Sequence, residues 1–136
     1  MTTTVILTSQ SIGTGSNVGE ELTFATTGMK VTKQAATTAF VISAKLTNGA
    51  ASYSLSTRPL IRYASSPFDL TYTAAPAIFR NGGSRYLEMV PAVGAGVIVS
   101  KSSEIETVCG NYIYIWCYIP TTSVAQLLDL SILELP

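Results

Sequence analysis

The residues from 112 to 119 are apolar or aromatic at odd and even positions alike. In an extended strand, successive side chains point to opposite faces. One face would carry Ile113, Ile115, Cys117 and Ile119, and the other an aromatic row of Tyr112, Tyr114, Trp116 and Tyr118. Because a strand at the protein surface leaves one face in water, this pattern predicts a strand that is covered on two sides, by its own fold or by another subunit.

Two other segments alternate clearly between apolar and polar positions. In residues 39–46 one face holds Phe40, Ile42, Ala44 and Leu46, and in residues 127–135 one face holds Leu128, Leu130 and Ile132. Turn signals such as Asn48-Gly49 and Asn81-Gly82-Gly83 interrupt the chain. Further short strands are expected at 3–8, 21–26, 29–32, 53–56, 60–63, 69–73, 86–90 and 97–100, and residues 101–107 are a strand end or a loop.

Short strands with turns every 8–12 residues or so are typical of an antiparallel sandwich. We therefore predict an all-β protein, an antiparallel β-sandwich that is jelly-roll-like. The only helix signal is weak and covers Thr122–Leu130. The domain is expected to span residues 20–136, and residues 1–19 form a strand and a Gly/Ser/Asn loop. This N-terminal arm is expected to contact a neighbouring subunit instead of completing its own core.

The charge of the chain is unusually low. Charged residues make up 12% of the sequence, about half the usual share, and eight basic and eight acidic residues cancel. A free monomer usually keeps its net charge away from zero for solubility. The composition therefore favours a subunit of an assembly, and a small secreted domain is the alternative.

The same composition argues against several partners. The few lysines and arginines are scattered, so direct nucleic-acid binding is not expected. No apolar run approaches the roughly 20 residues of a membrane-spanning helix. The N-terminus lacks the charged and apolar regions of a secretory signal, which suggests synthesis in a cytoplasm.

Candidate catalytic and metal-binding residues are few. The chain has no histidine, which excludes Ser-His-Asp and Cys-His arrangements, and the pair Cys109 and Cys117 is too small a ligand set for zinc. No disulfide, metal or cofactor is expected. If Glu104 and Glu106 lay on one strand face, their carboxylates would be about 7 Å apart, as in glycosidases. The simpler interpretation is a solvated strand, and we expect no enzyme activity.

The aromatic row has three possible roles. It is core, packed on the opposite sheet; or it is a subunit interface, where Tyr and Trp are enriched; or it is a platform on which sugar rings stack. These four residues are the candidates for an interface or ligand-facing site.

The C-terminal third resembles a known group of proteins. Its Gly-Asn-Tyr-Ile-Tyr-Ile-Trp-Cys-Tyr-Ile-Pro-Thr run (110–121), followed by Leu-Leu-Asp-Leu-Ser-Ile-Leu-Glu-Leu (127–135), is similar to the closing strands of small β-sandwich cement or decoration proteins of tailed phages. The resemblance implies a structural protein on the capsid surface, made in the host cytoplasm. Its partners would be the major capsid protein and copies of itself, in dimers or trimers. The alternative is a carbohydrate-binding or adhesion module of a phage tail or cell surface.

Overall fold

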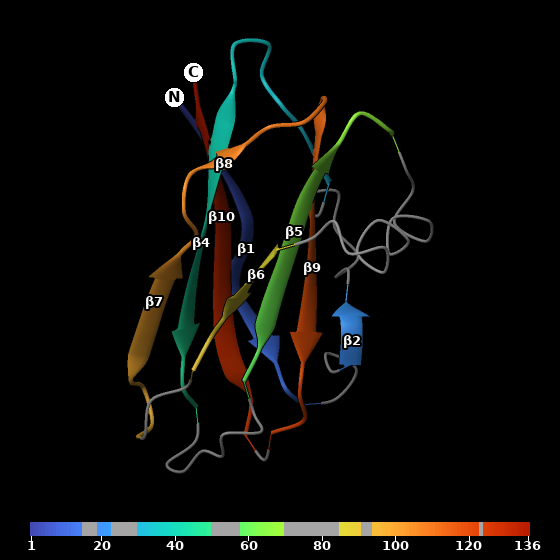
Figure 1. Cartoon of the computed structure of the whole chain (residues 1–136). Helices are drawn as coiled ribbons and strands as arrows, with labels where there is room; N and C mark the ends of the chain where they lie inside the picture. The colour runs from blue at the N-terminus through green and yellow to red at the C-terminus, as the bar shows by residue number, and fades with distance from the viewer. Residues whose placement is uncertain (15–18, 23–29, 50–57, 70–84, 91–93, 123) are drawn as a thin grey trace.

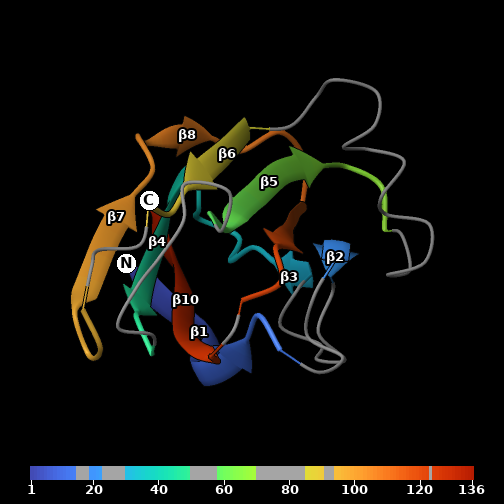
Figure 2. The ribbon, with the colours of Figure 1, turned by 90° about the horizontal axis from the view of Figure 1, so that it is seen from below.

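The structure is a computed structural model of the chain, and it describes residues 1–14, 19–22, 30–49, 58–69, 85–90, 94–122 and 124–136. Two antiparallel sheets pack face to face and form a β-sandwich (Figures 1 and 2), as the sequence predicted. The described residues contain no helix, and the strand that begins at Gln126 replaces the helix considered for Thr122–Leu130. The strands expected at 53–56 and 69–73 lie wholly or almost wholly outside the described residues.

Each sheet has a path of four strands and one short strand beside it. The first sheet, sheet A, has the order β1-β10-β4-β7, and β8 also pairs with β4. The second, sheet B, has the order β2-β9-β5-β6, and β3 also pairs with β9. The bounds are β1 Thr2–Ile12, β2 Gly19–Leu22, β3 Lys30–Thr32, β4 Ala39–Thr47, β5 Leu60–Ser66, β6 Arg85–Glu88, β7 Ile98–Ser102, β8 Glu106–Thr107, β9 Tyr112–Ile119 and β10 Gln126–Leu135.

The connections between the sheets define the fold more closely. We count β2 with β3 as one interrupted strand, and β7 with β8 as another, and number the resulting strands along the chain. In this numbering the neighbouring strands of sheet A are the first, eighth, third and sixth. Sheet B then has the order second, seventh, fourth, fifth. This alternation between two sheets is the jelly-roll arrangement of two Greek keys.

The main core lies between the sheets and uses the faces predicted from the alternation. From sheet A, β4 and β10 bury the two apolar faces that the sequence singled out, from Phe40 to Leu46 and from Leu128 to Ile132. From sheet B, β9 turns its isoleucine and cysteine face toward them. Register matters because a shift by one residue would turn each apolar set outward.

The expectation that the N-terminal arm leaves its own core was wrong. Strand β1 pairs with β10 from Thr2 to Ile12, and its Ile6, Leu7 and Ile12 are buried in the main core. Apolar side chains on the edge strand of a sandwich have a lower free energy when packed against the core beneath them than when exposed to water. Residues 2–12 are therefore an integral part of the domain.

A buried carboxylate ties the β3–β4 connection to the end of β10. The Glu134 Oε1 atom accepts hydrogen bonds from the Gln34 backbone N–H at 2.8 Å and from the Thr37 hydroxyl at 3.0 Å. The Thr38 N–H donates to the Leu135 carbonyl at 2.9 Å. These bonds satisfy Glu134 Oε1 and the donors that face it, whereas the buried Oε2 atom of the same carboxylate has no hydrogen-bond partner in the described part of the chain.

Gly110 fixes the entry into β9. Its φ is +92°, and a Cβ there would come within 2.3 Å of the Pro67 backbone nitrogen. Gly96 has a φ of +77°, but a Cβ there would have nothing within 4 Å. Among the glycines that the structure describes, Gly110 alone combines a left-handed conformation with close contact to another backbone segment.

We expect Gly110→Ala to lower the free energy of unfolding by more than about 2 kcal/mol, since it adds a backbone clash to the conformational cost. The matched variant Gly96→Ala should lose only about 1 kcal/mol, the conformational cost alone. Urea unfolding of both variants measures the difference. Equal losses would show that the contact between Gly110 and Pro67 does not matter.

Candidate functional site

The aromatic row lies on the outer face of sheet B, on the side of β9 that points away from sheet A. Tyr114 and Trp116 are nonetheless 0% exposed, whereas Tyr112 and Tyr118 are partly exposed. The rings follow one another along the strand, with centroids 6.5 Å apart for Tyr112 and Tyr114 and 5.8 Å apart for Tyr114 and Trp116. Tyr112, Tyr114 and Trp116 of the row therefore belong to a second, smaller cluster, separate from the main core.

The chain itself contacts this outer face. The Tyr114 hydroxyl donates to the Phe68 carbonyl at 2.5 Å, just after β5 ends. Next to it, Lys30 of β3 pairs with Asp69 at 2.6 Å. Tyr114 also packs against Ala64, its partner on β5. In this conformation Tyr114 and Trp116 are core residues, covered by their own chain and not by the opposite sheet, and neither presents a ring to solvent.

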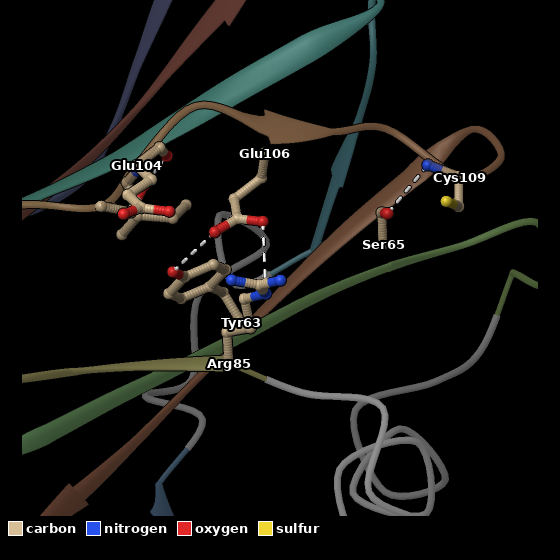
Figure 3. A network of polar contacts seen from close by, with 8 residues as sticks. Tyr63, Ser65, Arg85, Glu104, Glu106 and Cys109 are labelled. Carbon is tan, nitrogen blue, oxygen red and sulfur yellow. Dashed lines mark hydrogen bonds and ion pairs between the residues drawn. The ribbon is translucent and has the colours of Figure 1, made fainter.

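A network of polar side chains lies elsewhere, where the two sheets meet near β6 and β8. Tyr63 of β5 and Arg85 of β6 both point toward Glu106 of β8 (Figure 3). The Tyr63 hydroxyl donates to Glu106 Oε1 at 3.3 Å, and Arg85 Nε lies 3.5 Å from Glu106 Oε2. The Glu106 carboxylate thus links β8 of sheet A to β5 and β6 of sheet B.

Burial and charge shape the chemistry of this network. The Glu106 side chain is 16% exposed and that of Arg85 is 68% exposed, so the network runs from the protein interior to the surface. Burial, and next the negative charge of Glu106, raise the pKa of the Tyr63 phenol. Tyr63 therefore stays protonated and keeps donating to Glu106 across the neutral pH range.

Two hollows adjoin the network and share Tyr63, Arg85 and Glu106. The larger, about 470 Å³, is the edge pocket, and its remaining lining residues are Tyr86, Leu87, Lys101, Ser102, Ser103 and Glu104. The smaller, about 180 Å³, continues toward Ser65 and Cys109. There the Cys109 N–H donates to the Ser65 hydroxyl at 2.9 Å (Figure 3).

Glu104 and Glu106, considered together in the sequence, have different surroundings. Glu106 is held by Tyr63 and Arg85, whereas Glu104 is exposed and precedes β8. The strand geometry used for their spacing does not apply, since β8 begins only at Glu106. Sequence reasoning missed Tyr63 and Arg85, because both become neighbours of Glu106 only through the packing of the two sheets.

The two cysteines occupy contrasting positions. Both are free; Cys109 is exposed and Cys117 is buried. Burial raises the pKa of the Cys117 thiol from its ordinary value of 9.0 to about 12, so it remains an uncharged core group. Within the described residues, no group of three or more His, Cys, Asp or Glu side chains is placed to hold a metal ion.

Comparison with protein-family models, curated proteins and solved structures found no match. Among the described residues, no helix has the length and apolar character needed to cross a membrane.

Replacing Trp116 with Ala should lower the free energy of unfolding by about 3–5 kcal/mol, because it empties a fully buried site. Thermal and urea melts measure this loss. The partly exposed Tyr112→Ala variant provides the comparison, and it should lose clearly less. A Trp116→Ala protein of unchanged stability would show that the row is not core.

A thiol reagent should modify Cys109 rapidly and Cys117 only after unfolding, since the thiolate is the reactive form and Cys117 is buried and neutral. Counting modified thiols by mass spectrometry with and without denaturant tests this. Cys109→Ser should abolish labelling of the native protein. Rapid labelling of native Cys117 would contradict its position in the core.

Proposed function

We propose that this protein is a non-enzymatic structural subunit of a virion: a cement or decoration protein that binds the surface of a capsid and stabilises contacts between major capsid subunits. It is made in the host cytoplasm and associates as a dimer or trimer. The jelly roll supports the proposal in a general way, since viral capsid and lectin domains use it. Because a fold alone does not specify a function, the surfaces of this chain carry the rest of the argument.

The observation that carries the proposal is the contrast between strand edges. Unpaired edges invite association with other chains, and proteins commonly block them with charged residues. The edge strand β6 has Arg85 and Glu88, and β7 has Lys101. At the other edge of sheet A, β1 has no charged residue, no proline and no glycine over its 11 residues. The longest edge thus lacks charged residues, although its pairing with β10 shifts register between Val5 and Leu7 and between Leu7 and Gln10.

The outer face of sheet A adjoins β1, and its hollow contains one ion pair, Lys45 with Asp129, whose charges cancel. Its strands present small hydroxyl side chains side by side, and Ser43 and Ser102 share a hydrogen bond of 2.8 Å. A shallow hollow of about 300 Å³ runs across the face from β1 to β7. Lys45 and Asp129, 3.7 Å apart, form the ion pair of this hollow. Removing such a face from water costs less than removing a charged one, which suits a protein interface.

The alternative function, an adhesion module that stacks sugars on the aromatic row, finds less support. Such a platform needs exposed rings, and the two central rings, Tyr114 and Trp116, are fully buried. Sugar stacking on these rings would require the core to open, whereas an interface at β1 and the outer face of sheet A would leave the core unchanged.

Charge placed on this uncharged edge should block assembly without unfolding the subunit. Thr3 and Val5 are exposed, so Thr3→Lys with Val5→Lys should change stability by no more than about 1 kcal/mol. We expect the double variant to be monomeric in light scattering and to lose binding to the parent capsid in a sedimentation assay.

The control for this experiment is Thr121→Lys, which adds charge to an exposed loop near Gly13, at the end of β1 that is far from Thr3 and Val5. It should assemble and bind as the unmodified protein does. The proposal fails if the unmodified chain is a stable monomer with no affinity for any capsid. Full assembly of the double variant would instead show that β1 is not part of the interface.

A further inference from the structure

The edge pocket has the size and construction of a small-molecule site. Its volume of about 470 Å³ falls in the range of roughly 300–1,000 Å³ typical of ligand sites. It lies between β6 of sheet B and the β7–β8 segment of sheet A, so both layers of the sandwich contribute to its walls. Figure 2 shows β6 and β8 close together on one side of the sandwich.

Among the residues that the structure describes around the edge pocket, positive and negative charges balance. Arg85 and Lys101 contribute two positive charges, and Glu104 and Glu106 contribute two negative ones. A phosphate-bearing ligand would require an excess of positive charge, and a divalent cation would require an excess of oxygen ligands. Balanced charge with many hydrogen-bonding groups instead fits a neutral ligand that both donates and accepts hydrogen bonds.

Several groups around the pocket are held in place before any ligand arrives. Glu106 is fixed by Tyr63 and Arg85. The Ser103 hydroxyl accepts from the Ile42 N–H at 2.9 Å and donates to the Glu104 carbonyl at 2.7 Å. Groups fixed in this way lose little conformational entropy when a ligand binds.

Other groups keep hydrogen-bonding capacity for a ligand. The Glu104 carboxylate is exposed, and a carboxylate can accept several hydrogen bonds. Arg85 uses its Nε toward Glu106, and the two terminal nitrogens of its guanidinium are further donors. Lys101 Nζ lies 3.4 Å from the Glu88 carbonyl, at the boundary between the two sheets.

We propose that the edge pocket binds a neutral saccharide of one or two rings. The sugar hydroxyls donate to the carboxylates of Glu104 and Glu106 and accept from Arg85 and Lys101. The pocket is at the β6–β7 side of the sandwich, whereas the proposed capsid contacts centre on β1, the opposite edge of sheet A. The two surfaces adjoin at Ser102 of β7, so saccharide binding and capsid binding are measured by separate readouts.

The test is a titration of the isotope-labelled protein with maltose, cellobiose, lactose and diacetylchitobiose, followed by amide chemical shifts. Sialyllactose serves as the anionic comparison. At least one neutral disaccharide should shift the amides of residues 85–88 and 101–106, with a Kd of about 1 mM or tighter. Glu104→Gln and Arg85→Gln should each weaken that binding about tenfold, because each removes a charged hydrogen-bonding group.

Two control variants leave the pocket intact. Tyr112→Phe alters the aromatic row, and Lys45→Ala alters the outer face of sheet A; both should bind the saccharide as the unmodified protein does. The proposal is overturned if none of the four neutral disaccharides shifts the pocket amides, if sialyllactose binds more tightly than all of them, or if the shifts centre on the aromatic row. Light scattering of the same samples reports assembly separately, so failure here is distinguishable from failure of the capsid proposal.

Discussion

Strand β9 is buried on both of its faces, and the rest of the molecule is arranged to achieve this. Its isoleucine and cysteine face meets sheet A across the sandwich, and its aromatic face is covered by other parts of the same chain. A strand with two apolar faces is most stable inside a sheet, and β9 lies between β5 on one side and β2 and β3 on the other. The domain thus covers the apolar faces of β9 with its own chain and does not need another subunit to cover them.

This arrangement leaves the edges of the sandwich as the surfaces on which we propose recognition. The two central aromatic rings are used for stability, so they leave little for recognition. The surfaces that remain differ in chemistry: β1 is an uncharged edge, and the β6–β7 side has charged groups around a pocket. An uncharged edge suits pairing with another protein, whereas a charged, preorganised hollow suits a small polar ligand.

The Tyr63–Glu106–Arg85 network has a structural role whatever the pocket binds. It joins β8, which pairs with β4 in sheet A, to β5 and β6 in sheet B. Tyr63 also packs edge-on against Phe40, with ring centroids 6.1 Å apart, so the network rests on the main core. A ligand site built on such a cross-link has rigid walls, because both sheets hold them in place.

The sequence by itself determined the all-β class and the inward faces of β4 and β10, because alternation with period two is a local property of each strand. It also determined that β9 is covered on both faces. It did not determine which face of β9 meets the opposite sheet, since both faces are apolar and periodicity cannot rank them. The expectation that residues 1–19 do not complete their own core was wrong for the same kind of reason: the β-branched run in β1 predicts a strand but not its partner, which proved to be β10. Only the tertiary structure brought Tyr63, Arg85 and Glu106 together, because contacts between residues far apart in the chain depend on how the sheets pack, and no local pattern records that packing.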